Sequence, residues 1–442
     1  MDNSLLDLIK KDIFRGLKEY LKTFPDLDLW QFLRPFDYKK DTSSIYDEIK
    51  KGLIDHKEIL LYVHLPFCFS GCAFCNVNPF KSNKIIQIPY FEFLLKEIKT
   101  FAESALFKNK KISCIYFGGG TPTCFGIKSL AKLVENINRF FNLKENCNIT
   151  CETHPLHLLG QSGKKAIKDL QGAGINRMSM GVQTFDQRVL KYCNRYHTVA
   201  DIEEALNNLK TANMHHNLDM MIGLPGQTLS GVEQDLKKLE ELKPDAVEYM
   251  RHSVVNRRVI NLYKKSPELL TDKNTLFEMQ LMVHEWIEKN NYEQNGYFSK
   301  NSPFFPYRYA WVMEVPYLAF GARARSHLGG ITFLNYSHLI DYFLSIERKI
   351  IPVESFRIPN ETEKIFRTLY LRLQTQDGIS RAELQQRYGS NHYLIIEPVI
   401  EKLKQYNLII NDNKVIKLTN PYGRYFLEDI CNLIKKETLS LV

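Results

Sequence analysis

Residues 58–75 read EILLYVHLPFCFSGCAFC, an apolar run followed directly by three cysteines. The run at 58–66 is short, rich in apolar and β-branched side chains, and ends in proline, which is the pattern of a buried strand. The cysteines at 68, 72 and 75 then fall on the loop that leaves this strand. The stretch therefore predicts a strand whose carboxyl end carries a group of thiols.

Short apolar runs alternate with helical stretches along the chain that follows. This alternation predicts βα units and a parallel sheet. The predicted strands cover 58–66, 112–119, 148–155, 176–185, 217–225 and 246–255, and helices are expected near 89–107, 126–141, 163–172, 186–212, 230–242 and 271–292. Six units are too few to close an eight-stranded barrel. We therefore expect an α/β fold, an open partial (β/α)6 barrel, with its site at the carboxyl ends of the strands.

Segments on both sides of the barrel complete the predicted domain organisation. We expect a helical extension over 1–56, the barrel core over 57–300, and a segment over 301–358 that completes the core and covers the active site. Residues 359–442 change to short helices and a hairpin-like NDNKVIKLT, the order of a winged-helix-like α+β domain. Its helices mix Glu with Arg and lack a basic recognition face, so nucleic-acid binding is not expected.

The composition is that of an ordinary folded protein. Apolar residues make up 44% and charged residues 25%, and 59 Lys and Arg against 50 Asp and Glu give a net charge of +9 without a basic stripe. No stretch approaches the roughly 18 consecutive apolar residues of a membrane helix, and the start, MDNSLLDLIKKDIFRGL, has the pattern of an amphipathic helix rather than a signal peptide. We expect a cytoplasmic protein.

Nine cysteines are present, and only those at 68, 72 and 75 form a tight group. An odd number of scattered cysteines in a long chain argues against a disulfide framework and directs attention to the group as a metal site. Thiolates separated by three and two residues can converge on one face of an iron–sulfur cubane. Structural zinc and unrelated buried cysteines are the alternatives on spacing alone, although we find no second Cys or His pair to close a zinc site.

Three glycines, Gly118 to Gly120, end the second predicted strand and lead into Thr121. Glycine lacks a Cβ, so such a turn lets the backbone approach a ligand closely, but it is equally typical of a plain tight turn. In a partial barrel this turn and the cysteine loop leave adjacent strands at the same end. The glycine turn is therefore a candidate part of the site.

Four motifs in order, YVHLPFCFSGCAFC, YFGGGTPT, NRMSMGVQTFDQRVL and NLDMMIGLPGQT, resemble those of the radical S-adenosylmethionine (SAM) enzymes. The resemblance is to the branch of the oxygen-independent coproporphyrinogen III oxidases, which also includes haem chaperones, haem-degrading methyltransferases and other class C radical methylases. It spans residues 58–442, including the winged-helix-like tail.

The resemblance implies a [4Fe–4S] cluster with one iron open to the amino and carboxylate groups of SAM. One electron would cleave this SAM to methionine and a 5′-deoxyadenosyl radical, so the cofactor carries the difficult chemistry. Tyr62 and Gly119 match positions near this first SAM, and Glu152 would accept hydrogen bonds from its ammonium group or ribose. The implied cluster ligands are Cys68, Cys72 and Cys75.

Members of this branch bind a second SAM, and the resemblance implies the same here. Arg195 would pair bidentately with its carboxylate, and Asp219 would take its ammonium group. The matching positions are Phe74, Gly120, Thr121, Gln183, Arg195 and Asp219.

Two departures from the oxidases concern the reaction. The oxidases usually carry another cysteine two residues after the last ligand, where this chain has Asn76-Val77-Asn78, and their N-terminal Arg- and Tyr-containing segment is not recognisable. We therefore expect, first, a class C methyltransferase acting on an sp2 carbon of an aromatic, quinone or tetrapyrrole substrate. The alternatives are oxidative decarboxylation of coproporphyrinogen III and a haem chaperone without turnover.

Charged side chains near the expected rim bear on the substrate. Where the family usually has a GAGA turn, this chain has GARARSH at 321–327, which contains Arg323, Arg325 and His327. Two further residues of this kind, Arg251 and His252, lie near the end of the sixth predicted strand. They form either a solvated rim or an anion-binding set for a carboxylated tetrapyrrole or a quinone.

The expected partners are a small molecule and an electron donor such as flavodoxin or ferredoxin. For the haem-chaperone alternative, the candidate axial ligands are His64, His154 and His327.

Overall fold

The computed structural model describes residues 44–425 and 430, except 76, 78, 253, 255–256, 295–297, 300–305, 329, 413 and 420–421. The described residues form two compact units that divide between Pro359 and Asn360. Most of the expected N-terminal extension and of the last helix lies outside the described residues. The described part of the extension contains helix α2 (Ile45–Leu53). The domain limits at 56, 300 and 358 stay a prediction.

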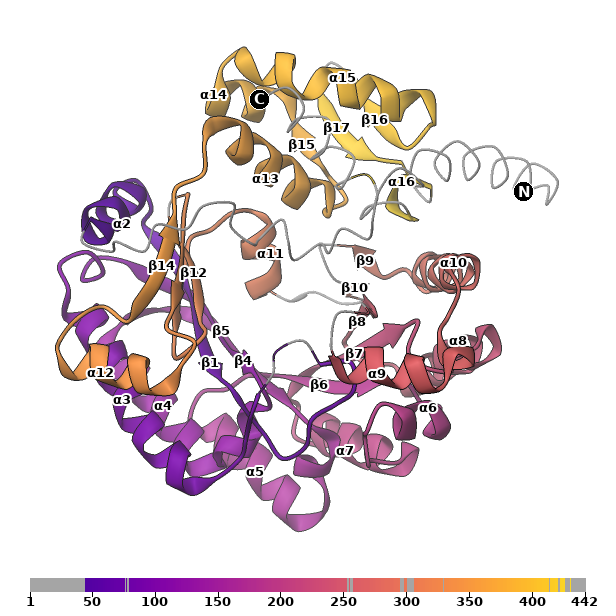
Figure 1. Ribbon diagram of the computed structural model, residues 1–442, viewed down its shortest axis with the longest axis horizontal. Helices are drawn as coiled ribbons and strands as arrows, with labels where there is room; N and C mark the ends of the chain where they lie inside the picture. Colours follow the sequence, from indigo (N-terminus) through magenta and orange to yellow (C-terminus); the bar gives the residue numbers. More distant parts are fainter. Residues whose placement is uncertain are drawn as a thin grey trace. The chain divides into compact units, whose positions relative to one another are not determined.

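The first unit is built on a twelve-stranded sheet in the order β14-β13-β12-β11-β1-β4-β5-β6-β7-β8-β10-β9. All six predicted strands are confirmed, and they lie side by side in chain order with parallel pairing (Figure 1). They are β1 (Glu58–Leu65), β4 (Lys111–Gly119), β5 (Asn142–Thr153), β6 (Arg177–Gln183), β7 (His215–Ile222) and β8 (Ala246–Arg251).

The predicted number of sheet strands was too small. A seventh parallel strand, β11 (Tyr317–Phe320), pairs with β1, and β12 (Arg325–Leu328), β13 (Ile331–Asn335) and β14 (Val353–Arg357) extend that edge in antiparallel fashion. At the other edge lie the two-residue strands β10 (Phe298–Ser299) and β9 (Glu293–Gln294). These strands are short and do not follow the βα rhythm, so periodicity alone could not identify them.

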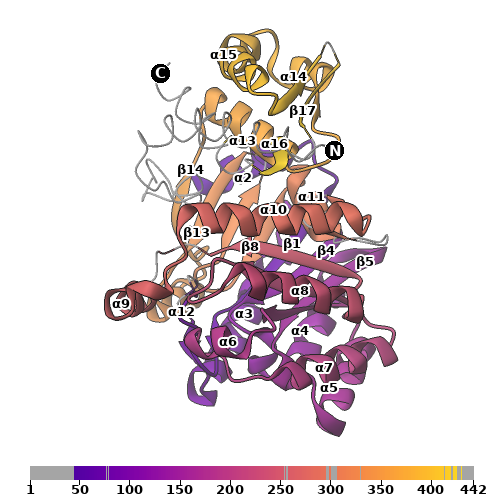
Figure 2. The same cartoon turned by 90° about the vertical axis from the view of Figure 1, so that its right-hand side faces the viewer.

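Helices cover the convex face of the sheet, as Figure 1 shows. Those after the first five parallel strands are α3 (Lys84–Glu103), α4 (Ile127–Phe140), α5 (Gly160–Gly172), α6 (Gln187–Tyr192), α7 (Val199–Thr211) and α8 (Leu229–Leu242). Helix α10 (Lys273–Lys289) packs beside α8 (Figure 2), and α9 (Arg257–Lys265), α11 (Pro306–Val312) and α12 (Leu339–Glu347) were not predicted. No helix of the described residues is long and apolar enough to cross a membrane.

The two faces of the parallel sheet differ in chemistry because successive side chains of a strand point to opposite faces. The face under the helices is apolar and buried and includes Leu61, Val63, Ile115, Phe117, Leu218 and Met220. The alternate positions on the same strands are polar and include Tyr62, Tyr116, Glu152 and Asp219. The sheet thus presents a polar concave face on which a site can be built.

The second unit contains helices and a small antiparallel sheet, as expected from the sequence. Helices α14 (Arg381–Tyr388) and α15 (Asn391–Gln405) precede the hairpin of β16 (Ile409–Asn411) and β17 (Val415–Leu418). Strand β15 (Ile379–Ser380) pairs with β17, and α13 (Glu361–Leu373) and α16 (Tyr422–Tyr425) lie at the two ends of this segment. Its winged-helix-like character stays a prediction.

A buried carboxyl fixes the turn after β11 to helix α3. Glu97 is 2% exposed and accepts hydrogen bonds from the backbone N–H of Gly321 at 2.8 Å, the amide of Asn335 at 2.7 Å and the hydroxyl of Tyr342 at 2.6 Å. Burial raises the pKa of Glu97 to about 7 despite these donors. One side chain therefore connects α3, the turn after β11, β13 and α12.

We expect the stability of the protein to depend on pH through Glu97. Between the usual carboxyl pKa of 4.5 and about 7, the folded state binds this proton more tightly than the unfolded state. The protonated Glu97 therefore makes its full contribution to the free energy of unfolding below about pH 4.5. As the pH rises to about 7, this contribution falls by about 3 kcal/mol. The free energies of unfolding of the wild type and Glu97→Gln, compared across this range, should diverge by that amount. The matched control is Glu92→Gln, an exposed carboxyl on the same helix, and an equal effect in both variants would refute this assignment.

Candidate functional site

The three clustered cysteines lie on one loop between β1 and α3. Cys68 ends the two-residue strand β2 (Phe67–Cys68), which pairs with β3 (Phe80–Lys81) beyond the loop. The three thiols are partly exposed, whereas the other described cysteines, at 114, 124, 147, 151 and 193, are buried. The loop therefore differs from the rest of the chain in offering accessible sulfur ligands.

The loop is held from two sides. The thiol of Cys68 lies 3.3 Å from the hydroxyl of Thr121, and a guanidinium nitrogen of Arg195 lies 3.5 Å from the sulfur of Cys72. Ala73 donates its backbone N–H to the carbonyl of Cys193 at 3.0 Å. These contacts bring the glycine turn and the segment after α6 against the cysteine loop.

The donor set fits an iron–sulfur cluster by its chemistry. Thiolates are the ligands that such clusters use, and three accessible thiols stand within eight residues. Burial raises the pKa of Cys68 to about 11, so this sulfur would become a thiolate only with a metal bound. In the described part of the chain no three His, Cys, Asp or Glu side chains are already gathered as a metal site. The assignment of the three ligands therefore stays a prediction.

The glycine turn after β4 packs tightly against the chain itself. A Cβ on Gly119, whose φ is +111°, would lie 2.6 Å from the ring of His64. A Cβ on Gly120 would lie 2.5 Å from the carbonyl oxygen of Phe67. The backbone of Thr121 also bonds to that carbonyl at 2.8 Å. Contact with β1 and β2 already requires glycine here, so the glycines do not by themselves identify a ligand.

Glu152 lies where the residues expected around the first SAM meet. Its carboxylate accepts hydrogen bonds from the hydroxyl of Tyr116 at 2.7 Å and from the backbone N–H of Gly119 at 3.2 Å. The rings of Tyr62 and Tyr116 stack with centroids 6.0 Å apart, and the hydroxyl of Tyr62 lies 3.1 Å from the Nδ1 atom of His64. Burial raises the pKa of Glu152 to about 7. The structure thus brings Tyr62, Gly119 and Glu152 together.

Gln183 and Arg195, expected around the second SAM, both lie beside Gly181. Arg195 is 8% exposed and donates a hydrogen bond to the carbonyl of Gly181. A Cβ on Gly181 would lie 2.9 Å from the amide nitrogen of Gln183 and 3.5 Å from a guanidinium nitrogen of Arg195. Within the described residues, the side-chain oxygen of Gln183 and the Nε atom of Arg195 are buried without a hydrogen-bond partner. Polar atoms of the two side chains thus remain available next to the cysteine loop.

Asp219 lies on the same face of the sheet but is bound mainly to its neighbours. It accepts a hydrogen bond from the hydroxyl of Ser179 at 3.0 Å and another from the amide of Asn217. Burial raises the pKa of Asp219 to about 6, although the positive charges of Arg177 and Arg195 oppose the increase. Asp219 is therefore electrostatically linked to Arg195, while its hydrogen bonds go to Ser179 and Asn217.

Phe74 has a packing role in the structure. It lies against a small apolar cluster formed by Val189, Cys193, Met221 and Leu224. This packing anchors the cysteine loop on the segments after β6 and β7. A contact of Phe74 with SAM stays a prediction.

The structure places the charged residues expected at the rim in separate environments. Arg323 donates to the carbonyls of Ser337 at 3.3 Å and Val77 at 3.5 Å, and its guanidinium carbon stands 4.4 Å from the centre of the Phe80 ring. His327 is 6% exposed and its Nδ1 atom lies 3.0 Å from the hydroxyl of Thr332.

The other members have different environments. Arg325 lies in β12 and Arg251 ends β8, while burial lowers the pKa of His252 to about 4 and keeps it neutral. A shared role for these residues and Arg323 or His327 in anion binding stays a prediction.

Three histidines near the cysteine loop form a cluster that the sequence analysis did not identify. The ring centroids of His154 and His197 are 5.0 Å apart, and those of His154 and His157 are 5.9 Å apart. His157 also packs edge-on against the ring of Phe69 at 5.4 Å and lies 2.6 Å from the hydroxyl of Thr123. Burial lowers the pKa values of His154, His157 and His197 to about 2, 4 and 3, so all three imidazoles are neutral near pH 7.

Further polar residues of the concave face were also missed. Counting by two along β7 from Asp219 reaches Asn217, because alternate residues share a face. Counting by two along β6 from Gln183 likewise reaches Ser179 and Arg177. The missed residues are Tyr116, Arg177, Ser179, Asn217 and Glu248.

Comparisons show which known proteins the chain is similar to. Residues 62–239 match the model of the Radical SAM superfamily. The chain is 28% identical over 367 residues to the heme chaperone HemW of Bacillus subtilis, covering 81% of this chain and 94% of that protein. It is 24% identical over 383 residues to the oxygen-independent coproporphyrinogen III oxidase of Helicobacter pylori, covering 82% and 83%.

A solved structure shares the fold. The coproporphyrinogen III oxidase HemN from Escherichia coli, described as a radical SAM enzyme, superposes with a TM-score of 0.78 at 21% identity, and the match covers 92% of this chain and 98% of that one. The likeness extends over both compact units of the chain.

Proposed function

The chain belongs to the radical SAM superfamily, in the branch of the oxygen-independent coproporphyrinogen III oxidases and the HemW haem chaperones, and from this we propose that it cleaves SAM reductively to act on a tetrapyrrole. The observation that carries the proposal is that the guanidinium of Arg195 contacts both the sulfur of Cys72 and the carbonyl of Gly181. It links the proposed cluster ligands directly to the proposed SAM contacts.

Cys68, Cys72 and Cys75 would hold a [4Fe–4S] cluster, which when bound supplies the electron that breaks a carbon–sulfur bond of SAM. Thr121 fixes the position of the Cys68 sulfur through its hydroxyl. The positive charge of Arg195 lies close to Cys72 and would stabilise a thiolate there. The chain's own residues thus orient the loop and adjust its charge.

Two SAM molecules are part of the proposal. Glu152, with Tyr62 and Gly119, would bind the ammonium group or ribose of the first, since a carboxylate accepts such donors. Arg195 would donate the N–H of its available Nε atom to the carboxylate of the second. The available side-chain oxygen of Gln183 would accept a hydrogen bond from the ammonium group of that molecule, which Asp219 would also bind. Phe74, Gly120 and Thr121 would border this second site.

We infer a tetrapyrrole substrate from the two relatives named above, a haem chaperone and a coproporphyrinogen oxidase. Methyl transfer was the reaction expected first from the sequence, but neither relative is named as a methyltransferase. The two alternatives, oxidative decarboxylation and a haem chaperone, are better supported. Methyl transfer becomes one outcome of product analysis.

The one-electron step also requires an electron donor such as flavodoxin or ferredoxin. It requires a reducing compartment as well, and we infer that the protein acts in the cytoplasm.

A haem chaperone is the second candidate function, and the histidine cluster favours it. Neutral imidazole is the form that ligates haem iron, and the cluster of His154, His157 and His197 stays neutral because it is buried. In this case the protein would bind haem tightly and turn over little SAM.

Product analysis separates these functions. Reconstituted protein is incubated anaerobically with reductant, methyl-labelled SAM and coproporphyrinogen III, haem or menaquinone, and the products are analysed by mass spectrometry. Loss of carboxyl groups from coproporphyrinogen identifies the oxidase, and label in a tetrapyrrole identifies methyl transfer. Stable haem binding without 5′-deoxyadenosine identifies the chaperone. A product from menaquinone alone, or neither a tetrapyrrole product nor haem binding, would contradict the proposed substrate class.

A further inference from the structure

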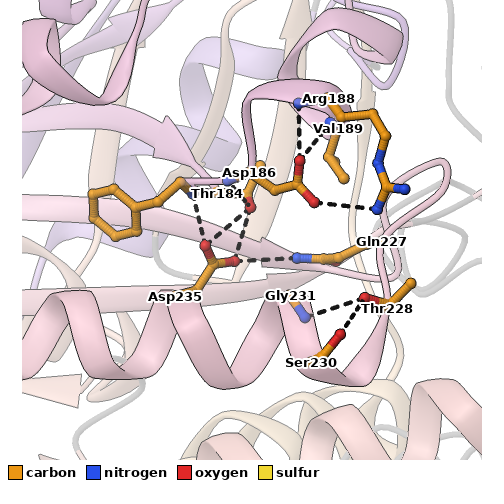
Figure 3. A network of polar contacts seen from close by, with 10 residues as sticks. Thr184, Asp186, Arg188, Val189, Gln227, Thr228, Ser230, Gly231 and Asp235 are labelled. Atoms are coloured by element: carbon orange, nitrogen blue, oxygen red, sulfur yellow. Dashed lines mark hydrogen bonds and ion pairs between the residues drawn. The ribbon is translucent and has the colours of Figure 1, made fainter.

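Asp235, on helix α8, is a buried carboxyl outside the site described above. It is 1% exposed and accepts hydrogen bonds from the Thr184 hydroxyl at 2.8 Å, the Phe185 backbone N–H at 2.7 Å and the Gln227 amide at 3.4 Å (Figure 3). Thr184 and Phe185 lie on the segment that follows β6, and Gln227 lies on the segment that follows β7. A single carboxyl therefore joins two loops at the carboxyl end of the sheet.

The first of these loops begins at Gln183, whose backbone is in an unfavourable conformation. Its φ is +76°, a region that residues other than glycine seldom adopt and that persists only when the surroundings enforce it. The next residue, Thr184, is fully buried, and its side chain bonds to both oxygens of Asp235. Asp235 thus holds the residue adjacent to Gln183 and fixes the direction of the Gln183 side chain toward Gly181 and Arg195.

The second loop connects Asp235 to the cysteine loop. Gln227 accepts a hydrogen bond from the backbone N–H of Leu224 at 3.2 Å and donates one to the carbonyl of Met221 at 3.2 Å. Met221 and Leu224 belong to the apolar cluster on which Phe74 packs. The position of Phe74, between Cys72 and Cys75, therefore depends on a loop that Asp235 helps to hold.

We propose that Asp235 is a positioning residue for SAM binding, because it fixes both the turn that aims Gln183 and the loop that supports Phe74. This inference rests on the proposed function. The hydrogen bonds of the Asp235 carboxyl go to Thr184, Phe185 and Gln227, so it acts on the site through these three residues. Burial raises its pKa to about 7, which is consistent with a carboxyl enclosed by protein on all sides.

A purely structural role in helix α8 is the competing explanation, and Thr228 provides the matched control. Its hydroxyl accepts a hydrogen bond from the backbone N–H of Gly231 at 3.1 Å and caps the same helix, and its other hydrogen-bond contact is with the hydroxyl of Ser230 (Figure 3). Removing this cap should destabilise α8 without releasing Gln183. A comparison of the two positions therefore separates helix stability from positioning.

The test uses the full chain, reconstituted with iron and sulfide, as Asp235→Ala, Asp235→Asn and Thr228→Ala. We expect Asp235→Ala to raise the KM for SAM about tenfold in product formation, which needs the second SAM that Gln183 and Phe74 would contact. The kcat should change less than threefold, as is typical when a supporting partner of a ligand contact is lost. Asp235→Asn keeps an acceptor for the Phe185 N–H and should recover most of the affinity. Thr228→Ala should keep the KM of the wild type. Equal KM values for Asp235→Ala and Thr228→Ala would overturn the proposal.

Hydrogen–deuterium exchange gives a readout that does not depend on SAM. Asp235→Ala should exchange faster than the wild type at residues 184–186 and 221–227, and Thr228→Ala should do so only near the start of α8. If Asp235→Ala does not fold, Asp235→Asn gives the same test. Its side-chain NH2 group would face the donating amide of Gln227 and could not accept that hydrogen bond, so faster exchange is expected at residues 221–227 only. If exchange is unchanged in both segments, the inference is overturned. If the exchange pattern is as expected but the wild type does not cleave SAM, only the proposed function is overturned.

Discussion

Replacing Cys68, Cys72 or Cys75 by alanine is expected to abolish reductive cleavage of SAM. Each thiol would supply one of the three protein ligands of the cluster, and losing any one exposes a second iron and destabilises the assembly. The anaerobically reconstituted wild type should carry about four irons and four sulfides per chain. The measurements are iron and sulfide content and the amount of 5′-deoxyadenosine formed with excess reductant.

Cys147 provides the matched control for these variants. It is a buried cysteine of β5 whose side chain belongs to the main apolar core rather than to the cysteine loop, so Cys147→Ala removes a thiol without changing that loop. We expect this variant to retain the cluster and SAM cleavage. Wild-type cleavage by Cys72→Ala would rule out the ligand assignment.

Asp219→Ala is expected to remove most product formation while the cluster remains intact. The side chain of Asp219 bonds to Ser179 and Asn217 rather than to the cysteine loop. The loss of one hydrogen bond to a charged group costs about 1.5–3 kcal/mol, or roughly a ten- to hundredfold loss of affinity for the second SAM. Iron–sulfur absorbance and 5′-deoxyadenosine formation with SAM in excess should persist. The control is Asp245→Ala, which removes a half-exposed carboxyl directly before the first residue of β8 and should behave as the wild type. Normal product formation by Asp219→Ala would contradict the two-SAM mechanism.

Arg195→Ala is expected to have a broader effect than the sequence alone predicts. The sequence suggested that Arg195 serves only the second SAM, but its guanidinium lies 3.5 Å from the sulfur of Cys72. Its removal should therefore weaken SAM binding and also change the spectroscopic signature of the cluster. Electron paramagnetic resonance of the reduced protein checks this, and a spectrum identical to that of the wild type would show that the contact has no effect on the cluster.

The six central strands could be predicted because each combines a short apolar run with a following helix. Their carboxyl ends also locate Glu152, Gln183 and Asp219 near the cysteine loop, because parallel strands end at one edge. The strands β11 to β14 could not be predicted in the same way, since they are short and the pairing that joins them to the central strands, between β11 and β1, links residues distant in sequence. The connection of Glu97 to the turn at Gly321 is of this second kind.

The details of the site depend on side-chain directions that a sequence does not contain. The contact of Arg195 with Cys72 joins residues 123 positions apart. The histidine cluster likewise joins His154 and His157 with His197 across two strands. Motifs identify which residues belong to the site, whereas packing decides which of them touch.

The most direct measurement of the central claim is the stoichiometry of SAM cleavage by the anaerobically reconstituted wild type. With a one-electron reductant and excess SAM, we expect 5′-deoxyadenosine and methionine in equal amounts, no cleavage without reductant, and none in Cys68→Ala. Formation of neither product by a protein that carries about four irons and four sulfides would contradict the claim that this chain is a SAM-cleaving radical enzyme.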